Sequence, residues 1–164
     1  MADSQYSLLA GRNSSPLDSS EIRRVTNVFL GLDNSVNVRY DPQCRTKFQV
    51  SLDETNEPFG EIVFGPDIYP GTGIVDPNSA LSLDAAAAHE LTHYHRWKDK
   101  SALEEDSLEH LDEALTSLQA IARYEGQLSQ NDVRQLVSDA AQRIQLFIHD
   151  LSEAPPSSTQ QTSK

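Results

Sequence analysis

The sequence is poor in cysteine, in positive charge and in long apolar runs. Its 164 residues include one cysteine, Cys44, so an internal disulfide and a cysteine-based zinc cluster are both excluded. A single cysteine suits a reducing compartment, and we expect a cytoplasmic protein. Lysine and arginine number 13 against 25 aspartate and glutamate residues, giving a net charge of -12. A negative field of this size repels phosphate backbones and anionic lipids, so we expect neither nucleic acid nor a membrane as a partner.

The length and composition predict one domain. The chain is 37% hydrophobic, which is enough for one ordinary core, and no apolar run approaches the length of a membrane-spanning helix. Residues 1–17 mix serine, asparagine, glycine and proline without periodicity, and residues 154–164 have almost no apolar content. We expect both segments to be disordered, with the folded domain over residues 18–153.

The first half of this domain predicts one helix followed by three short strands. Asp18 and Glu21 have the spacing of a capping box, and apolar residues then recur at helical spacing as far as Leu32. The apolar pattern next changes to alternation or to short continuous runs, which are typical of strands. These runs cover residues 36–40, 48–50 and 62–64.

The second half predicts three helices. The first starts near Ser79 or Ser82, passes through four successive alanines and ends after Trp97. Two more follow, one over about 103–124 and one from about 131 onward. The last carries an apolar stripe that we interpret as core packing, made of Val133, Leu136, Val137, Ala140, Ile144, Ile148 and Leu151. Together the elements predict an α+β fold with a small sheet and about four helices.

The first of these three helices carries the pattern His-Glu-x-x-His at His89, Glu90 and His93. Residues four apart lie on one face of a helix, so both imidazoles can reach a single ion. Glu90 points beside that ion, where its carboxylate can take a proton from a water whose pKa the ion lowers. The pattern predicts one zinc ion per chain, with Glu90 as the general base.

A catalytic zinc usually has three protein ligands, so a third ligand is needed from elsewhere in the chain. His95 faces away from His89 and His93, which leaves the acidic residues of the next helix as the better source. Helical periodicity sorts the residues of that helix into two faces. The apolar face comprises Leu108, Leu111, Leu115, Leu118 and Ala122, and the face expected to meet water comprises Glu105, Glu109, Asp112, Thr116 and Arg123.

Glu113 belongs to neither face. It lines up with Ser117, Ala120 and Tyr124, a strip of mostly small residues that allows another helix to approach closely. We therefore predict Glu113 as the third ligand. Glu109 and Asp112 remain the alternatives.

Two segments, His89-Glu90-Leu91-Thr92-His93 and Asp112-Glu113-Ala114, resemble the gluzincin branch of zinc metallopeptidases, including the bacterial ImmA/IrrE-like peptidases. In that branch a second helix supplies a glutamate ligand. The resemblance covers about residues 18–125 and implies hydrolysis of a protein or peptide substrate. It also implies that the strand before the motif helix is a sheet edge that pairs with extended substrate. The residues of that strand which would then bind substrate are Ile62, Val63 and Phe64.

The donor that would stabilise the tetrahedral oxyanion is left open by the sequence. The candidates are Tyr124, which we also name as a substrate contact, His110, Arg123 and Tyr69.

Two other functions share parts of this pattern. Glu90 and His93 also match one Glu-x-x-His element of a di-iron bundle, but such a bundle needs the element twice. A catalytically silent zinc-binding regulatory module with the same fold is the second alternative. Glu90 argues against it, because a structural zinc needs no carboxylate to activate water. The sequence indicates neither the substrate's identity nor the oligomeric state.

Overall fold

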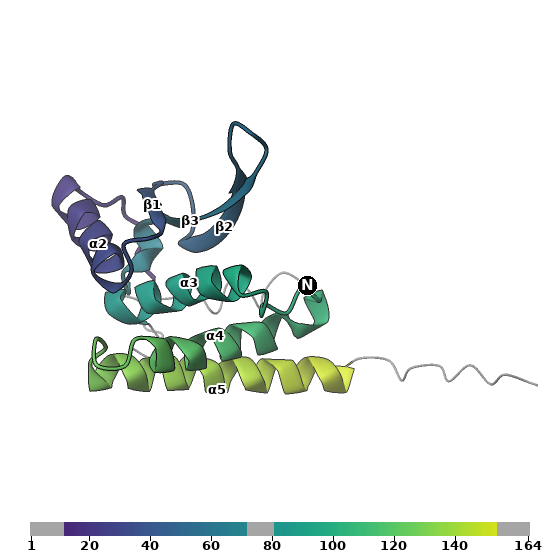
Figure 1. Cartoon of the computed structure of the whole chain (residues 1–164). Coiled ribbons are helices and arrows are strands. Elements are labelled where there is room, and N and C mark those ends of the chain that lie inside the picture. Colours follow the sequence, from purple (N-terminus) through teal and green to yellow (C-terminus); the bar gives the residue numbers. More distant parts are fainter. Residues whose placement is uncertain (1–11, 72–80, 154–164) are drawn as a thin grey trace, which may run out of the picture.

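The structure is a computed structural model that describes residues 12–71 and 81–153. It has the predicted α+β fold, with a mixed three-stranded sheet beside a group of helices (Figure 1). The elements are α2 (Ser19–Leu32), β1 (Asn37–Tyr40), β2 (Lys47–Leu52), β3 (Pro58–Phe64), α3 (Leu83–Lys98), α4 (Glu109–Arg123) and α5 (Gln130–Glu153), with 3-10 turns at Pro66–Ile68 and Asp106–Leu108. None of the helices in these two ranges is both long and apolar enough to cross a membrane.

The predicted starts of α2 and α3 are confirmed by their caps. The Asp18 carboxylate accepts the backbone N–H of Glu21 at 2.9 Å, and the Glu21 carboxylate accepts the N–H of Asp18 at 2.8 Å. The Ser82 hydroxyl accepts the N–H of Ala85 at 3.1 Å. These bonds satisfy donors that the first turn of a helix leaves free, so local sequence fixes where the motif helix begins.

The sheet order is β1-β3-β2, which makes β3 the central strand. β3 pairs in parallel with β1 and antiparallel with β2. The prediction that β3 is a sheet edge is therefore wrong. Ile62, Val63 and Phe64 have no exposed surface, so their side chains cannot contact a substrate. The two edge strands are therefore β1 and β2, and β2 is the one that bonds to α3, through the backbone N–H of Phe48 and the carboxylate of Glu90.

Residues 12–17, predicted to be disordered, pack onto the domain. Leu17 is buried, and its backbone N–H donates to the hydroxyl of Tyr40 at 2.9 Å. The Arg12 guanidinium donates to the carbonyl of Leu81 at 2.7 Å. The prediction is wrong for these residues because their partners lie far along the chain, where composition gives no signal. The rest of the two segments predicted to be disordered lies outside the described residues, at 1–11 and 154–164.

α3 lies between the sheet and α4 (Figure 1). A helix that is covered on both sides needs small or apolar residues around most of its circumference. The alanine run Ala85–Ala88 supplies them, and all four alanines are at most 5% exposed. The motif residues that follow are thus held on a helix with little freedom to move.

Gly60 on β3 allows the sheet to approach α3 closely. A Cβ at this position would lie 2.8 Å from the Phe48 ring and 2.9 Å from the Tyr94 ring. Phe48 and Trp97 also pack together, with ring centroids 5.7 Å apart. The aromatic cluster of Phe48, Tyr94 and Trp97 therefore fills the space above Gly60 and fixes β2 against α3.

α4 is rotated relative to the prediction. Thr116 has no exposed surface and Asp112 is 8% exposed, whereas Leu118 is 42% exposed. The prediction that Asp112 and Thr116 meet water is wrong. Hydrophobic periodicity failed here because the residues that face the neighbouring helices are mostly small or polar, namely Ala114, Thr116, Ser117 and Ala120.

An ion pair between Arg96 and Asp112 joins α3 to α4 inside the protein. Arg96 is 2% exposed, and its guanidinium also donates to the carbonyl of Ser101 at 3.0 Å. The Asp112 carboxylate accepts the backbone N–H of Leu103 at 2.7 Å. The pair thus fixes the connection between the two helices as well as their approach.

We predict that Asp112→Ala lowers the free energy of unfolding by about 3–5 kcal/mol, because it leaves the Arg96 charge buried without a partner. Urea denaturation monitored by circular dichroism measures the change. Glu109→Ala, an exposed site on the same turn, is the control and should stay within about 0.5 kcal/mol of wild type. Equal effects of the two substitutions would contradict a buried ion pair.

Candidate metal centre

The side chains of His89, His93 and Glu113 converge at the contact between α3 and α4, and they could hold a metal ion. The two histidines come from successive turns of α3, and Glu113 comes from the first turns of α4. His89 Nε2 lies 3.1 Å from His93 Nε2 and 3.2 Å from Glu113 Oε2. His93 Nε2 lies 3.3 Å from Glu113 Oε1. Glu113, the predicted third ligand, thus lies beside the two histidines, and among the described residues its two alternatives do not belong to the group.

The two imidazole nitrogens are spaced like ligands of one zinc ion. Ligand atoms about 2.0–2.1 Å from a zinc ion in tetrahedral geometry lie about 3.3 Å apart, and His89 Nε2 and His93 Nε2 are 3.1 Å apart. Each nitrogen lies within 3.3 Å of a different oxygen of Glu113, and one ligand atom from each of the three residues lies within 4.8 Å of the others. These residues therefore have the chemistry and the convergence to hold a zinc ion with three protein ligands and one further position.

A hydrogen-bonded chain behind His89 orients its ring. The Asp139 carboxylate is an acceptor, so the Ser117 hydroxyl donates to it, at 2.6 Å. The Ser117 oxygen is then free to accept from His89 Nδ1, 2.8 Å away. This order assigns the proton of neutral His89 to Nδ1 and leaves the Nε2 lone pair pointing at His93 and Glu113, as a metal ligand requires.

Arg143 of α5 lies behind the glutamate ligand. Its Nη2 is 3.7 Å from Glu113 Oε2, and its Nε is 3.6 Å from Asp139 Oδ1. All three helices α3, α4 and α5 therefore contribute to the centre. The positive charge of Arg143 attracts both carboxylates, Glu113 and Asp139, and so offsets the repulsion between them.

The Glu113 carboxylate is in its ionised form over a wide pH range. Burial alone would raise the pKa of Glu113, but hydrogen bonds and charge from His89 and His93 outweigh burial and hold the pKa well below its ordinary value. An ionised carboxylate beside two imidazoles is the form that binds a cation.

Glu90 lies on the side of α3 that faces the sheet. Its carboxylate accepts the backbone N–H of Phe48 at 2.8 Å. Burial raises the pKa of Glu90 to about 7; the positive charge of His93 and the Phe48 hydrogen bond oppose that rise, and the charge of Glu113 adds to it. A carboxylate with this pKa can accept a proton and release it again near neutral pH.

The two alternative ligands, Glu109 and Asp112, lie elsewhere. Asp112 is bound to Arg96, and Glu109 is exposed to solvent. Among the described residues neither belongs to the group that could hold a metal ion. The rotation of α4 that buries Asp112 against α3 is the same rotation that brings Glu113 to the histidines.

The four oxyanion candidates do not join the centre. Tyr124 is 3% exposed and its position, eleven residues beyond Glu113, lies about 16 Å further along the helix. Burial raises the pKa of Tyr124, and the prediction that it contacts substrate is wrong. Arg123 lies 3.6 Å from Asp99 and His110 lies 3.6 Å from Asp150, both at ion-pair range. The Tyr69 hydroxyl is buried without a hydrogen-bond partner among the described residues.

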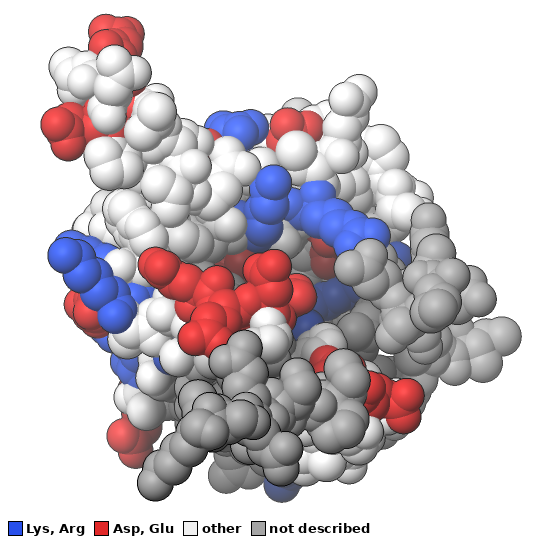
Figure 2. Space-filling model, turned by 90° about the vertical axis from the view of Figure 1, so that its right-hand side faces the viewer, with Lys and Arg blue, Asp and Glu red and all other residues white. Residues whose placement is uncertain are grey.

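An acidic hollow of about 160 Å³ opens beside Glu113. Figure 2 shows acidic side chains gathered on this end of the molecule. Their negative field attracts cations, which raises the local concentration of a divalent ion near the three ligand atoms. The hollow is lined by Leu103, Glu104, Glu105, Asp106, Glu109, Asp112 and Glu113.

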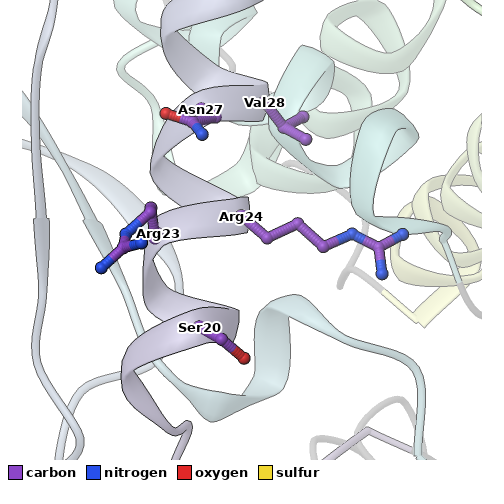
Figure 3. A pocket seen from close by; sticks show the side chains of 5 residues that line it. All are labelled: Ser20, Arg23, Arg24, Asn27 and Val28. Carbon is purple, nitrogen blue, oxygen red and sulfur yellow. The ribbon is translucent and has the colours of Figure 1, made fainter.

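A larger, more open hollow of about 410 Å³ lies on α2, away from the metal ligands. It is lined by Ser20, Arg23, Arg24, Asn27 and Val28 (Figure 3). Figure 3 shows Arg23 and Arg24 pointing away from each other, so their guanidinium groups do not converge on one anion. We assign no function to this hollow.

Sequence reasoning missed the supporting roles of Asp139, Arg143 and Phe48. Asp139 and Arg143 are four residues apart and lie beside the buried Leu136 and Ala140. Charged residues on the buried side of an amphipathic helix are a signal that each has a partner inside the protein, but this signal does not identify the partner. The Phe48 contact uses a backbone N–H, which has no signal in the sequence.

We predict that Ser117→Ala weakens zinc binding by about 10–100-fold, because His89 loses the bond that fixes its tautomer and orientation. Asp139→Asn should act in the same direction. Competition with a chromophoric chelator measures the affinity.

Ser138→Ala, one residue from Asp139 on α5, is the matched control and should bind zinc like wild type. Thermal unfolding of the zinc-free proteins separates loss of orientation from loss of fold. Wild-type zinc affinity in both Ser117→Ala and Asp139→Asn would contradict the orienting role.

Comparison of the chain with protein-family models, with curated proteins and with solved structures gives no match. The resemblance to gluzincins therefore rests on the motif residues of the sequence.

Proposed function

We propose that the protein is a zinc-dependent metallopeptidase that hydrolyses peptide bonds in a protein or peptide substrate. The observation that carries this proposal is the convergence of His89, His93 and Glu113, which bring one ligand atom each to within 4.8 Å of one another. Glu90 adds a carboxylate with a pKa of about 7 on the residue next to the first ligand. Two imidazoles and one carboxylate with a further position open are a typical ligand set for catalytic zinc.

Each residue of the site has a distinct role in the proposed reaction. A zinc ion bound by the three ligands would polarise the scissile carbonyl and lower the pKa of a water molecule. Glu90 accepts the proton of the attacking water and later gives it to the leaving amine. The Phe48 N–H holds the Glu90 carboxylate in place at 2.8 Å, while Ser117 and Asp139 orient His89.

The free edge of β2 supports an extended peptide as the substrate. Phe48 directs its N–H to Glu90 rather than to β3, and backbone direction alternates along a strand. Val50 therefore also directs its N–H and C=O away from β3, and its side chain is 44% exposed. A peptide that pairs with this edge would run past Glu90 and the metal ligands.

The experiment that tests the proposal compares wild type with His93→Ala, Glu113→Ala and Glu90→Gln. We expect about one zinc per chain in wild type and in Glu90→Gln, and loss of zinc in the two ligand variants. Cleavage of an unstructured, fluorescently labelled protein should fall by about 10²–10⁴-fold in Glu90→Gln. Elemental analysis and a fluorescence assay supply the two readouts.

Two outcomes would contradict the proposal in different ways. Wild type that binds no zinc at micromolar concentration would remove the metal site. Wild type that binds zinc but cleaves no unstructured substrate, like Glu90→Gln, would favour the silent zinc-binding module instead.

The β2 edge gives a separate prediction. Val50→Pro removes an N–H that faces away from β3, and proline is tolerated at such edge positions. We expect it to reduce cleavage at least about 10-fold while zinc content and circular dichroism stay unchanged, because a paired peptide loses one backbone hydrogen bond and register. Val50→Thr keeps the N–H and is the control. Cleavage by Val50→Pro at the wild-type rate would exclude pairing of substrate at this edge.

A further inference from the structure

The solvent side of α5 carries an apolar stripe. Val137, Ile144, Ile148 and Leu151 are between 38% and 59% exposed, and Ala141 is exposed beside them. The spacings along the five residues are four, three, four and three, which is the spacing of residues that pack between two helices of a coiled coil. The interpretation of this stripe as core packing is wrong for these positions, since only Leu136 and Ala140 are fully buried.

The exposed Leu118 of α4 and the half-buried Leu111 and Leu115 lie on the same side. The contacts Glu113 to Arg143 and Ser117 to Asp139 run in opposite directions along the two helices, so α4 and α5 are antiparallel. Successive residues of an α-helix are about 100° apart around its axis. Each apolar residue of the two stripes directly follows a residue that faces the other helix, as Leu118 follows Ser117, and is therefore rotated by about 100° away from the contact between α4 and α5. In an antiparallel pair this places both stripes on one side, and together they form the α4–α5 apolar face. It comprises Leu111, Leu115, Leu118 and Ala122 of α4 and Val137, Ala141, Ile144, Ile148 and Leu151 of α5.

We propose that the α4–α5 apolar face is the interface of a homodimer. The face contains no charged residue, in a chain whose net charge is -12. Three α5 residues along its outer border are also neutral, namely Ser138, Gln145 and Ser152, and Arg134 on the same border carries a positive charge. Two copies of an acidic protein approach with least repulsion through such a surface.

The stripe is complementary to itself when two α5 helices pair antiparallel about a two-fold axis at Ile144. Such pairing sets small Ala141 opposite large Ile148, and it sets Val137 opposite Leu151. It also brings Arg134 of one copy beside Glu153 of the other, both of which are exposed. Parallel pairing would place like charges together, so charge favours the antiparallel arrangement.

The size of the face is sufficient for a specific dimer. Its exposed apolar side chains amount to roughly 500 Å² per copy, at the upper end of what a monomer usually leaves open. Two copies would bury on the order of 1,000 Å² of apolar area together with the flanking polar surface, which reaches the range of stable interfaces. The metal ligands lie on the α3 side of α4, so the dimer leaves the centre accessible and the inference does not depend on the proposed function.

Sedimentation velocity of the full chain tests the dimer. Protein concentrations between about 1 and 100 micromolar suit it, because they span a dissociation constant of about micromolar size. We expect a dimer in wild type and about 100-fold weaker association in Ile148→Glu. His149→Glu adds the same charge one residue away, outside the stripe, and should remain a dimer. Zinc content should be unchanged in both variants, which separates this test from that of the peptidase.

A charge exchange tests the orientation. Arg134→Glu should weaken the dimer, and adding Glu153→Arg should restore it. These two residues are about 28 Å apart along one helix, so recovery reports a contact between copies.

Three results would overturn the proposal. The first is a wild-type protein that stays monomeric at about 100 micromolar, and the second is a dimer that Ile148→Glu does not weaken. The third is a dimer that forms only after deletion of residues 1–11, which would mean that the chain's own N-terminal segment covers the face. Failure of the charge exchange would overturn the antiparallel arrangement.

Discussion

The close approach of α4 to α3 is the constraint on which the rest of the structure depends. Ser117 and Ala120 have no exposed surface, and their small side chains allow the two helices to come within reach of each other. Only at that separation can Glu113 approach His89 and His93. The same approach places Asp112 on Arg96 and Ser117 on His89, so one packing distance sets both the stability of the contact and the geometry of the centre.

Much of the fold could be predicted because its signals are local. Asp18 and Ser82 start their helices through bonds to residues two or three positions away, and the His-Glu-x-x-His spacing needs only a regular helix to bring His89 and His93 together. Glu113 was also predictable, since the strip of small residues in line with it indicates where a neighbouring helix can approach.

The predictions that were wrong all concern which helices and strands are neighbours in space. Nothing in the residues of β3 indicates that β1 joins it in parallel and leaves β2 at the edge. The amphipathic pattern of α4 was misleading because a buried arginine draws in Asp112, while Leu118 faces outward. Asp139 could not be assigned to the metal centre without knowing that α5 lies against Ser117. These are long-range contacts, and periodicity along one helix does not identify its neighbour.

The centre draws on two separate stretches of the chain. Among the described residues, the three candidate ligands and the groups that orient His89 lie on α3, α4 and α5, whereas the β2–β3 hairpin donates a backbone N–H to Glu90. A backbone donor places no demand on side-chain identity. Under the proposed function, the exposed side chains of the hairpin, such as Val50 and Leu52, could thus diverge during evolution and alter which substrate is recognised, while the three candidate ligands lie on a different part of the sequence.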